Sequence, residues 1–238
     1  MKVTYLEHSG FAAEYKEYVL IFDWYRGSLP EFDQQKKIYV FASHSHYDHF
    51  NKKIFGWSEQ YPDVRYILSA DIAGKEQSEE QSERTVYVTA NKKYDFDGIK
   101  VQTLHSTDEG VAFIVYMEDK VIYHAGDLNW WHWEEESIDY NRQMRKDYQR
   151  EIRKLVRRKI DLAFVVLDPR QGGAAFSGID FFMRNVRVNH VFPMHMWRDY
   201  GLTDRLLTSE ISASYRNRIH RVWEEGQTVE IHGQKGET

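Results

Sequence analysis

A run of metal-binding residue types follows a short apolar segment without interruption. Residues 38–42 are apolar throughout and have the length of a buried strand. Residues 44–49 then read His-Ser-His-Tyr-Asp-His, which places three imidazoles and a carboxylate in one short loop. Histidine and carboxylate are preferred ligands of Zn²⁺ and similar cations. The spacing of apolar residues predicts a helix over residues 50–60, so the loop would be held by a strand before it and a helix after it. Such a loop can face two metal ions. The plainer alternative is a polar loop with hydrogen-bonded histidines.

Composition sets limits on the class of protein. With 42% hydrophobic and 15% aromatic residues, the 238-residue chain can bury a sizeable core. Its 32 basic and 37 acidic residues give a net charge of −5, so it has no general attraction to nucleic acid or anionic membranes. The absence of cysteine excludes disulfides and thiolate ligands. We expect one domain over residues 1–238, located in the cytoplasm, since the sequence shows neither a bilayer-spanning apolar run nor a signal peptide.

Short apolar or alternating segments predict many strands and few helices. The expected strands lie near residues 3–7, 11–15, 18–22, 38–42, 64–68, 85–88, 93–96, 99–104, 111–117, 121–124, 162–167 and 188–192. Turn signals between residues 85 and 124 favour a meander there. Helical spacing appears over residues 134–159, 179–186 and 202–218. This order favours an α/β fold with sheet in the middle and helices outside.

Three further strands end in a residue that can bind metal. His105, Asp127 and His195 follow the strands near 99–104, 121–124 and 188–192. A single histidine at a strand end is more often an ordinary surface residue. Together with the 44–49 loop, however, these positions predict a site assembled from distant parts of the chain at one sheet edge.

The ordered motifs resemble those of the metallo-β-lactamase-fold hydrolase superfamily. The matching positions are Asp23, His44-x-His46-x-Asp48-His49, His105, Gly126-Asp127 and His195. The opening His8-Ser9-Gly10-Phe11 resembles the branch that contains the L-ascorbate-6-phosphate lactonase. The resemblance implies a four-layer αββα sandwich with mostly antiparallel or mixed sheets. It also implies two divalent metal ions, with Zn²⁺ as the first choice and Mn or Fe as alternatives.

The resemblance also implies a role for each candidate ligand. His44, His46 and His105 would bind the first metal; Asp48, His49 and His195 would bind the second; Asp127 would bridge both. A carboxylate bridges two cations more readily than an imidazole does. Two cations roughly 3.5–4 Å apart lower the pKa of a shared water, so a bridging hydroxide is the expected nucleophile. Asp48 is the expected catalytic residue, because it could also orient that hydroxide.

Several residues close to these candidate ligands can each be interpreted in two ways. Ser106, Thr107 and Asp108 could supply contacts in place of His105. Asp23 either holds a ligand histidine by its second ring nitrogen or is an ordinary turn residue. His8 either approaches the metals or lies at a strand end on the surface.

We expect the residues that contact the substrate to lie beside Asp127. Trp130, Trp131, His132 and Trp133 follow it closely, and these rings either wall a pocket or pack the next helix against the sheet. Arg170 and Arg198 could bind an anionic group, although either could instead form a surface ion pair.

These observations favour a binuclear hydrolase acting on a small, possibly anionic lactone, ester or phosphorylated sugar derivative, without nucleic-acid or membrane partners. A homo-oligomer remains open. A phosphodiesterase or nuclease is the first alternative, but the chain has no long basic arm. A second alternative is a metal-binding protein without catalysis. Di-iron oxygen-reducing relatives carry Glu in the middle of the histidine motif, where this chain has His46.

Overall fold

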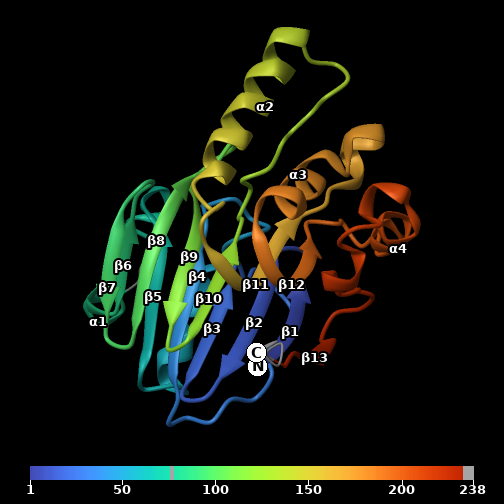
Figure 1. Ribbon diagram of the computed structural model, residues 1–238. Coiled ribbons are helices and arrows are strands. Elements are labelled where there is room, and N and C mark those ends of the chain that lie inside the picture. Colours follow the sequence, from blue (N-terminus) through green and yellow to red (C-terminus); the bar gives the residue numbers. More distant parts are fainter. Residues whose placement is uncertain (76–77, 233–238) are drawn as a thin grey trace. The chain divides into compact units, whose positions relative to one another are not determined.

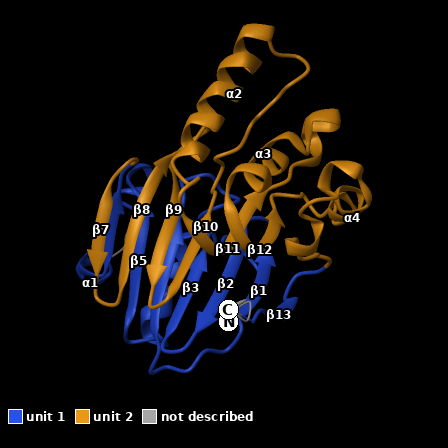
Figure 2. Ribbon diagram, in the orientation of Figure 1, with its two compact units in different colours: residues 1–89, 224–238 blue, residues 90–223 orange. Residues whose placement is uncertain are grey.

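The structure, a computed structural model, describes residues 1–75 and 78–232 (Figure 1). The chain forms two compact units, one built from residues 1–89 with the C-terminal segment from residue 224, and the other from residues 90–223 (Figure 2). Each unit contains one mixed sheet and its own helices, which confirms the α/β class. The expectation of a single domain over residues 1–238 stays a prediction.

Unit 1 is built around a sheet that has seven strands in the described residues, in the order β13-β1-β2-β3-β4-β5-β6. Strands β13, β1, β2 and β3 pair antiparallel, and β3 to β6 pair parallel. The elements of this unit are β1 (Lys2–Glu7), β2 (Gly10–Tyr15), β3 (Tyr18–Phe22), β4 (Lys37–Ala42), η1 (Lys52–Glu59), β5 (Val64–Ser69), η2 (Ala70–Ile72), α1 (Glu79–Glu83), β6 (Thr85–Val88) and β13 (Thr228–Glu230).

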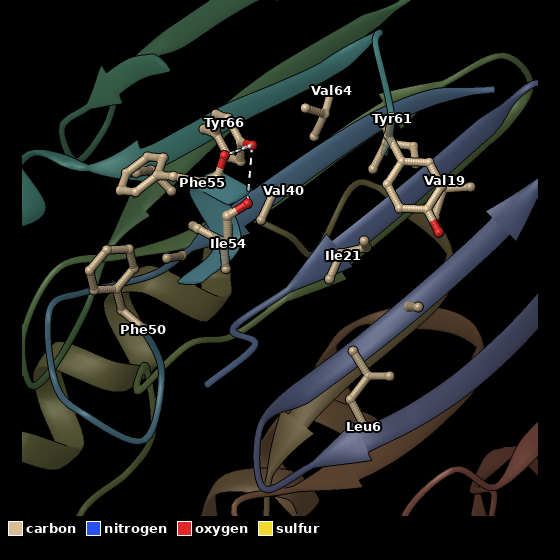
Figure 3. Packing of buried hydrophobic residues seen from close by; sticks show 14 of the residues in the cluster. Leu6, Val19, Ile21, Val40, Phe50, Ile54, Phe55, Tyr61, Val64 and Tyr66 are labelled. Atoms are coloured by element: carbon tan, nitrogen blue, oxygen red, sulfur yellow. Dashed lines mark hydrogen bonds between the residues drawn. The ribbon is translucent and has the colours of Figure 1, made fainter. Parts of the chain in front are cut away.

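A hydrophobic cluster on one face of this sheet fixes β4 and the segment after it (Figure 3). Val40 of β4 packs with Ile54 and Phe55 of η1, all at most 1% exposed. The hydroxyl of Tyr66 donates to the carbonyl oxygen of Ile54 at 3.1 Å and so ties η1 to β5. The loop between β4 and η1, which carries residues 44–49, is therefore anchored at both ends by buried apolar side chains.

Unit 2 contains a second mixed sheet, with six strands in the order β12-β11-β10-β9-β8-β7 over its described residues. Strands β7 to β10 are antiparallel, whereas β10, β11 and β12 are parallel. The elements are β7 (Lys93–Phe96), β8 (Ile99–His105), β9 (Val111–Met117), β10 (Lys120–His124), α2 (Ile138–Arg153), β11 (Lys159–Val166), η3 (Pro169–Ala174), α3 (Ser177–Asn185), β12 (Arg187–Met194), α4 (Gly201–Thr208), η4 (Glu210–Ser212) and η5 (Arg216–Arg218).

The expected meander over residues 85–124 is wrong at its first strand. Strand β6 pairs parallel with β5 in unit 1, and only β7 to β10 form the meander. Alternation along a short strand indicates that it pairs, but it does not say which sheet it joins. The expected helix over residues 50–60 is a 3₁₀ helix, and Gly56 in its interior disfavours an α-helix.

Two expected helices are shorter than predicted. Helix α2 begins after Ser137, whose hydroxyl accepts a hydrogen bond from the Tyr140 N–H at 3.1 Å, so the acidic residues 134–136 lie outside it. Helix α4 ends at Thr208, because Ser209 is extended and its hydroxyl accepts from the Ile211 N–H at 3.2 Å, which starts the separate turn η4. A serine therefore sets the start of α2 and the end of α4.

A half-buried histidine pair in unit 2 gives a first testable prediction. Nε2 of His220 lies 2.9 Å from Nδ1 of His190, and the His220 ring stacks on Phe192 with centroids 4.5 Å apart. Burial, together with the nearby charge of His190, lowers the pKa of His220 from 6.5 to about 4. The unfolded chain therefore binds this proton at a higher pH than the folded chain. The full shift corresponds to about 3 kcal/mol, but solvent screens the half-buried ring, so we expect stability to fall by about 2 kcal/mol as the pH drops from about 6.5 to about 4.

Urea titrations across that pH window test this expectation. A His220→Gln variant lacks the titrating group, so its free energy of unfolding should change less steeply between pH 6.5 and pH 4. Equal slopes for the parent and the variant would contradict the assignment.

Candidate metal centre

In unit 1, a buried carboxylate organises the histidine loop from the end of strand β3. Asp23 is fully buried, and its carboxylate accepts hydrogen bonds from the backbone N–H and the hydroxyl of Ser43, both at 2.7 Å. The same carboxylate lies 2.7 Å from Nδ1 of His49. Such a carboxylate fixes the proton on Nδ1, so the lone pair of Nε2 is available to a cation. Of the two interpretations of Asp23, the structure favours the one in which it holds a histidine.

His44 and His46 face each other in the same loop. Nδ1 of His44 lies 2.9 Å from the Ser43 hydroxyl, and its Nε2 lies 3.0 Å from Nδ1 of His46. His44 is fully buried, whereas His46 is exposed. Hydrogen bonds from the N–H groups of His49 and Phe50 to the His46 carbonyl oxygen close the turn that brings these rings together. Two ring nitrogens at this distance share a hydrogen bond, and they are also close enough to bind one cation together.

Asp48 lies beside His8 and His49. Ligand atoms of these residues lie within 4.8 Å of one another, and Nε2 of His8 is 3.4 Å from the Asp48 carboxylate. Burial opposes ionisation of Asp48, but the hydrogen bond to His8 and the electrostatic influence of the nearby His49 and His8 outweigh it, so the pKa of Asp48 lies well below its usual range. His8 is only 2% exposed, so it belongs to this cluster and not to a surface strand end.

In unit 2, Asp127 and His195 approach each other from the ends of β10 and β12. Nε2 of His195 lies 3.3 Å from an Asp127 carboxylate oxygen. The Thr107 hydroxyl accepts a hydrogen bond from the Asn129 N–H at 2.9 Å, and the indole of Trp131 donates to the Asp127 carbonyl oxygen at 3.0 Å. These contacts fix the short loop that carries Asp127.

A second buried carboxylate holds His195. Asp168 is fully buried and lies 2.8 Å from Nδ1 of His195, while Arg170 donates to both of its oxygens. Burial opposes ionisation of Asp168, and the hydrogen bonds from His195 and Arg170 outweigh it and lower the pKa of Asp168. The Arg170 guanidinium in turn lies over the rings of Trp197 and Trp133, at 4.8 and 5.7 Å. Arg170 thus acts on His195 through Asp168.

The segment after β12 is conformationally strained. His195, Trp197 and Arg198 all have left-handed backbone torsions, with φ of 68°, 51° and 66°. Non-glycine residues adopt this region rarely and at a cost, and such residues gather at functional sites. The strain supports a functional role for this segment.

Three other histidines lie apart from these groups. His105 is exposed at the end of β8, its Nδ1 contacts the Ser106 carbonyl oxygen, and the groups of close ligand atoms found in the described residues do not include it. Its role as a ligand stays a prediction. His124 is fully buried against Phe164 in the core. His132 lines a groove together with Trp130 and Trp133.

The donor set in each unit fits a divalent cation. His49 and His195 share one arrangement, in which a fully buried aspartate takes Nδ1 and leaves Nε2 to face a neighbouring ligand group. An imidazole held in this way is the usual form of a metal-binding histidine. Neutral imidazoles and ionised carboxylates suit Zn, Mn and Fe alike.

Sequence reasoning missed two of the residues that build these arrangements. Ser43 was not singled out at all, and Asp168 was noted only as part of a loop after a strand. Asp168 does share with Asp127 the signal of an aspartate shortly after a buried strand. Ser43 has no such signal, since serine is common in turns and its hydroxyl becomes informative only beside Asp23 and His44.

Comparisons with known proteins identify the fold. No family model and no curated protein matches this sequence. Igni18, a metallo hydrolase from the hyperthermophilic archaeon Ignicoccus hospitalis, matches in structure with a TM-score of 0.67 and 15% identity, over 98% of this chain and 99% of that chain. The metallo-β-lactamase-fold protein YhfI from Bacillus subtilis matches with a TM-score of 0.61 and 14% identity, over 96% and 98%. This chain has the metallo-β-lactamase fold.

The same fold is found in proteins with different metal chemistry. CmlA from Streptomyces venezuelae, a diiron β-hydroxylase, matches with a TM-score of 0.61 and 10% identity, over 97% of this chain and 54% of that chain. The fold alone therefore does not determine which metal is bound, because that depends on the ligand residues.

Within the described residues, no helix is both long and apolar enough to cross a membrane.

Proposed function

We propose that this protein is a metal-dependent hydrolase that binds two divalent cations. The observation that carries the proposal is the matched pair of histidines, His49 and His195, each held at Nδ1 by a fully buried aspartate. Metal-binding histidines almost always donate their second ring N–H to such a carboxylate. The metallo-β-lactamase fold, which metallo hydrolases such as Igni18 also have, supports the same proposal.

Seven ligands are proposed. The first cation would be bound by His44, His46 and His105, the second by Asp48, His49 and His195, and Asp127 would bridge them. Zn²⁺ is our first choice of metal, with Mn and Fe as alternatives. Two such cations, when bound, activate water and polarise a carbonyl or phosphoryl oxygen of the substrate.

The residues of the chain have separate tasks in this proposal. Asp23 and Asp168 hold the imidazoles of His49 and His195 in one tautomer. Asp48 is ionised at neutral pH, because its pKa is lowered, and it can accept a hydrogen bond from the attacking water. The proposed substrate is a small lactone, ester or phosphorylated sugar derivative, the class suggested by the resemblance to the ascorbate-phosphate lactonase branch, and the proposed location is the cytoplasm.

Metal removal and reloading test the proposal. The purified protein should contain close to two divalent cations per chain, and a chelator should lower its hydrolysis rate on a panel of lactones, nitrophenyl esters and phosphodiesters at least about 100-fold. Reloading with Zn²⁺, Mn²⁺ or Fe²⁺ should restore the rate and identify the metal.

Two outcomes would overturn the proposal. One is a metal-free protein that hydrolyses the panel as fast as the loaded protein. The other is a loaded protein that hydrolyses nothing but, with iron, consumes oxygen, which would indicate oxidative chemistry.

A further inference from the structure

A groove in unit 2 lies between residues 130–136 and the first turns of α2. Its volume is about 440 Å³, within the range of small-molecule sites. The lining includes Trp130, Trp133 and Ile138, and Ile138 is 78% exposed although it is a large apolar residue. The groove therefore offers aromatic and aliphatic surface to a ligand.

The backbone of both tryptophans is held in place. The Asn141 side chain accepts from the Trp133 N–H at 3.0 Å and donates to the Trp133 carbonyl oxygen at 2.7 Å. The Gln171 side chain donates to the Trp130 carbonyl oxygen at 2.8 Å, and its own oxygen accepts from Asn129 at 2.9 Å. Side-chain amides from α2 and η3 thus fix the groove wall in advance, which lowers the entropic cost of binding.

One arginine of the groove differs from its neighbours on α2. Arg142 pairs with Asp139, and Arg150 pairs with Asp147. The guanidinium of Arg145 lies instead over the Trp130 ring, at 5.1 Å, and no carboxylate of the described residues pairs with it. A guanidinium that stacks on an indole keeps its N–H edges available for an anion.

The groove is close to the proposed metal ligands of the same unit. Trp133 stacks on Trp131, with centroids 5.6 Å apart and planes at 8°, and the Trp131 ring lies 5.7 Å from the His195 ring. Two ring contacts therefore connect the groove to His195. This separation suits an extended substrate whose reacting bond and distal group occupy different places.

The charges of the lining indicate what the distal group is. Glu134 and Glu136 line the groove together with Arg142 and Arg145, so acidic and basic side chains balance and a polyanion is disfavoured. We propose that the groove binds a flat aromatic group that carries one carboxylate, with the ring against Trp130 and Trp133 and the carboxylate on Arg145. Its role as the substrate's distal subsite rests on the proposed function and, among the proposed substrates, fits a lactone or ester and not a phosphorylated sugar. Its capacity to bind such a group does not rest on the proposed function.

Calorimetric titration of the metal-free protein tests the groove separately from hydrolysis. 2-Naphthoate is the probe, with neutral 2-naphthol and ring-free acetate as comparison ligands. We expect 2-naphthoate to bind about tenfold more tightly than 2-naphthol and acetate not to bind measurably. Arg145→Gln should weaken 2-naphthoate about tenfold and leave 2-naphthol unchanged. The control Arg153→Gln, on the last turn of the same helix, should bind like the parent.

The possible outcomes separate the two proposals. Equal binding of 2-naphthoate by the parent and Arg145→Gln, or equal binding of 2-naphthoate and 2-naphthol, would overturn the groove and leave the hydrolase proposal standing. Arg145-dependent binding in a protein without hydrolase activity would keep the groove as a ligand site and overturn the proposed function. Because Arg145 is exposed, its replacement should not disturb folding.

Discussion

A His46→Ala variant should lose metal-dependent hydrolysis, while the melting temperature of its metal-free form stays within about 2 °C of that of the metal-free parent. His46 is exposed, so truncating its side chain leaves no cavity in the core. Its ring nitrogen lies 3.0 Å from Nε2 of His44, and in the proposed centre both bind the first cation. We expect the hydrolysis rate to fall at least about 100-fold and the bound metal to fall from two ions toward one.

His232→Ala is the matched control. His232 is likewise exposed and belongs to neither proposed metal site, so its replacement should leave both the rate and the metal content unchanged. Full activity of His46→Ala with two bound metals would remove His46 from the ligand set. A much lower melting temperature of the metal-free variant than of the metal-free parent would mean that the loop depends on this ring for folding.

An Asp23→Asn variant should bind its second metal about 10- to 100-fold more weakly than the parent. Asparagine keeps the shape of the side chain and can still accept from the Ser43 N–H. Its amide N–H₂ cannot accept the proton of Nδ1 of His49, so the imidazole is no longer fixed with Nε2 unprotonated. Competition with a chromogenic chelator measures this affinity directly, without reference to turnover.

Asp23→Glu and Asp23→Ala complete that experiment. Glutamate restores the charge in a site without spare room, so it should recover part of the affinity at the expense of stability. Alanine leaves the Ser43 and His49 donors unsatisfied in a fully buried place, which should cost several kcal/mol of folding stability. Unchanged metal affinity in Asp23→Asn would show that Asp23 serves the fold alone.

The strands were predictable from the sequence because apolar segments of strand length are distinctive. The buried strand β4 and the loop after it were expected within a residue of where they lie. Helix ends were less predictable, since a single serine at position 137 or 209 sets them locally. The sheet that β6 joins depends on pairing partners, on which alternation carries no information.

The candidate site was likewise predictable from the sequence only in part. The histidine and aspartate residues of the 44–49 loop and of the strand ends pointed to the groups around His49 and His195, whose ligand atoms lie close together. Their role as metal ligands stays a prediction. The contacts of Asp168 could not be inferred, because they depend on how β11 and β12 align as parallel neighbours. The exposed position of His105 was equally hidden, since a strand end fixes where a residue lies but not the direction of its side chain.

The left-handed residues after β12 matter for anyone who wishes to redesign the substrate preference. Saturation mutagenesis usually assumes that every position near a site tolerates all side chains equally. Trp197 and Arg198, however, have backbone torsions that β-branched side chains avoid. Glycine, asparagine and aspartate adopt them with less penalty. A library that allows only these residues at positions 197 and 198 should contain a larger share of folded variants. Full randomisation is better applied to the residues of the groove beside α2.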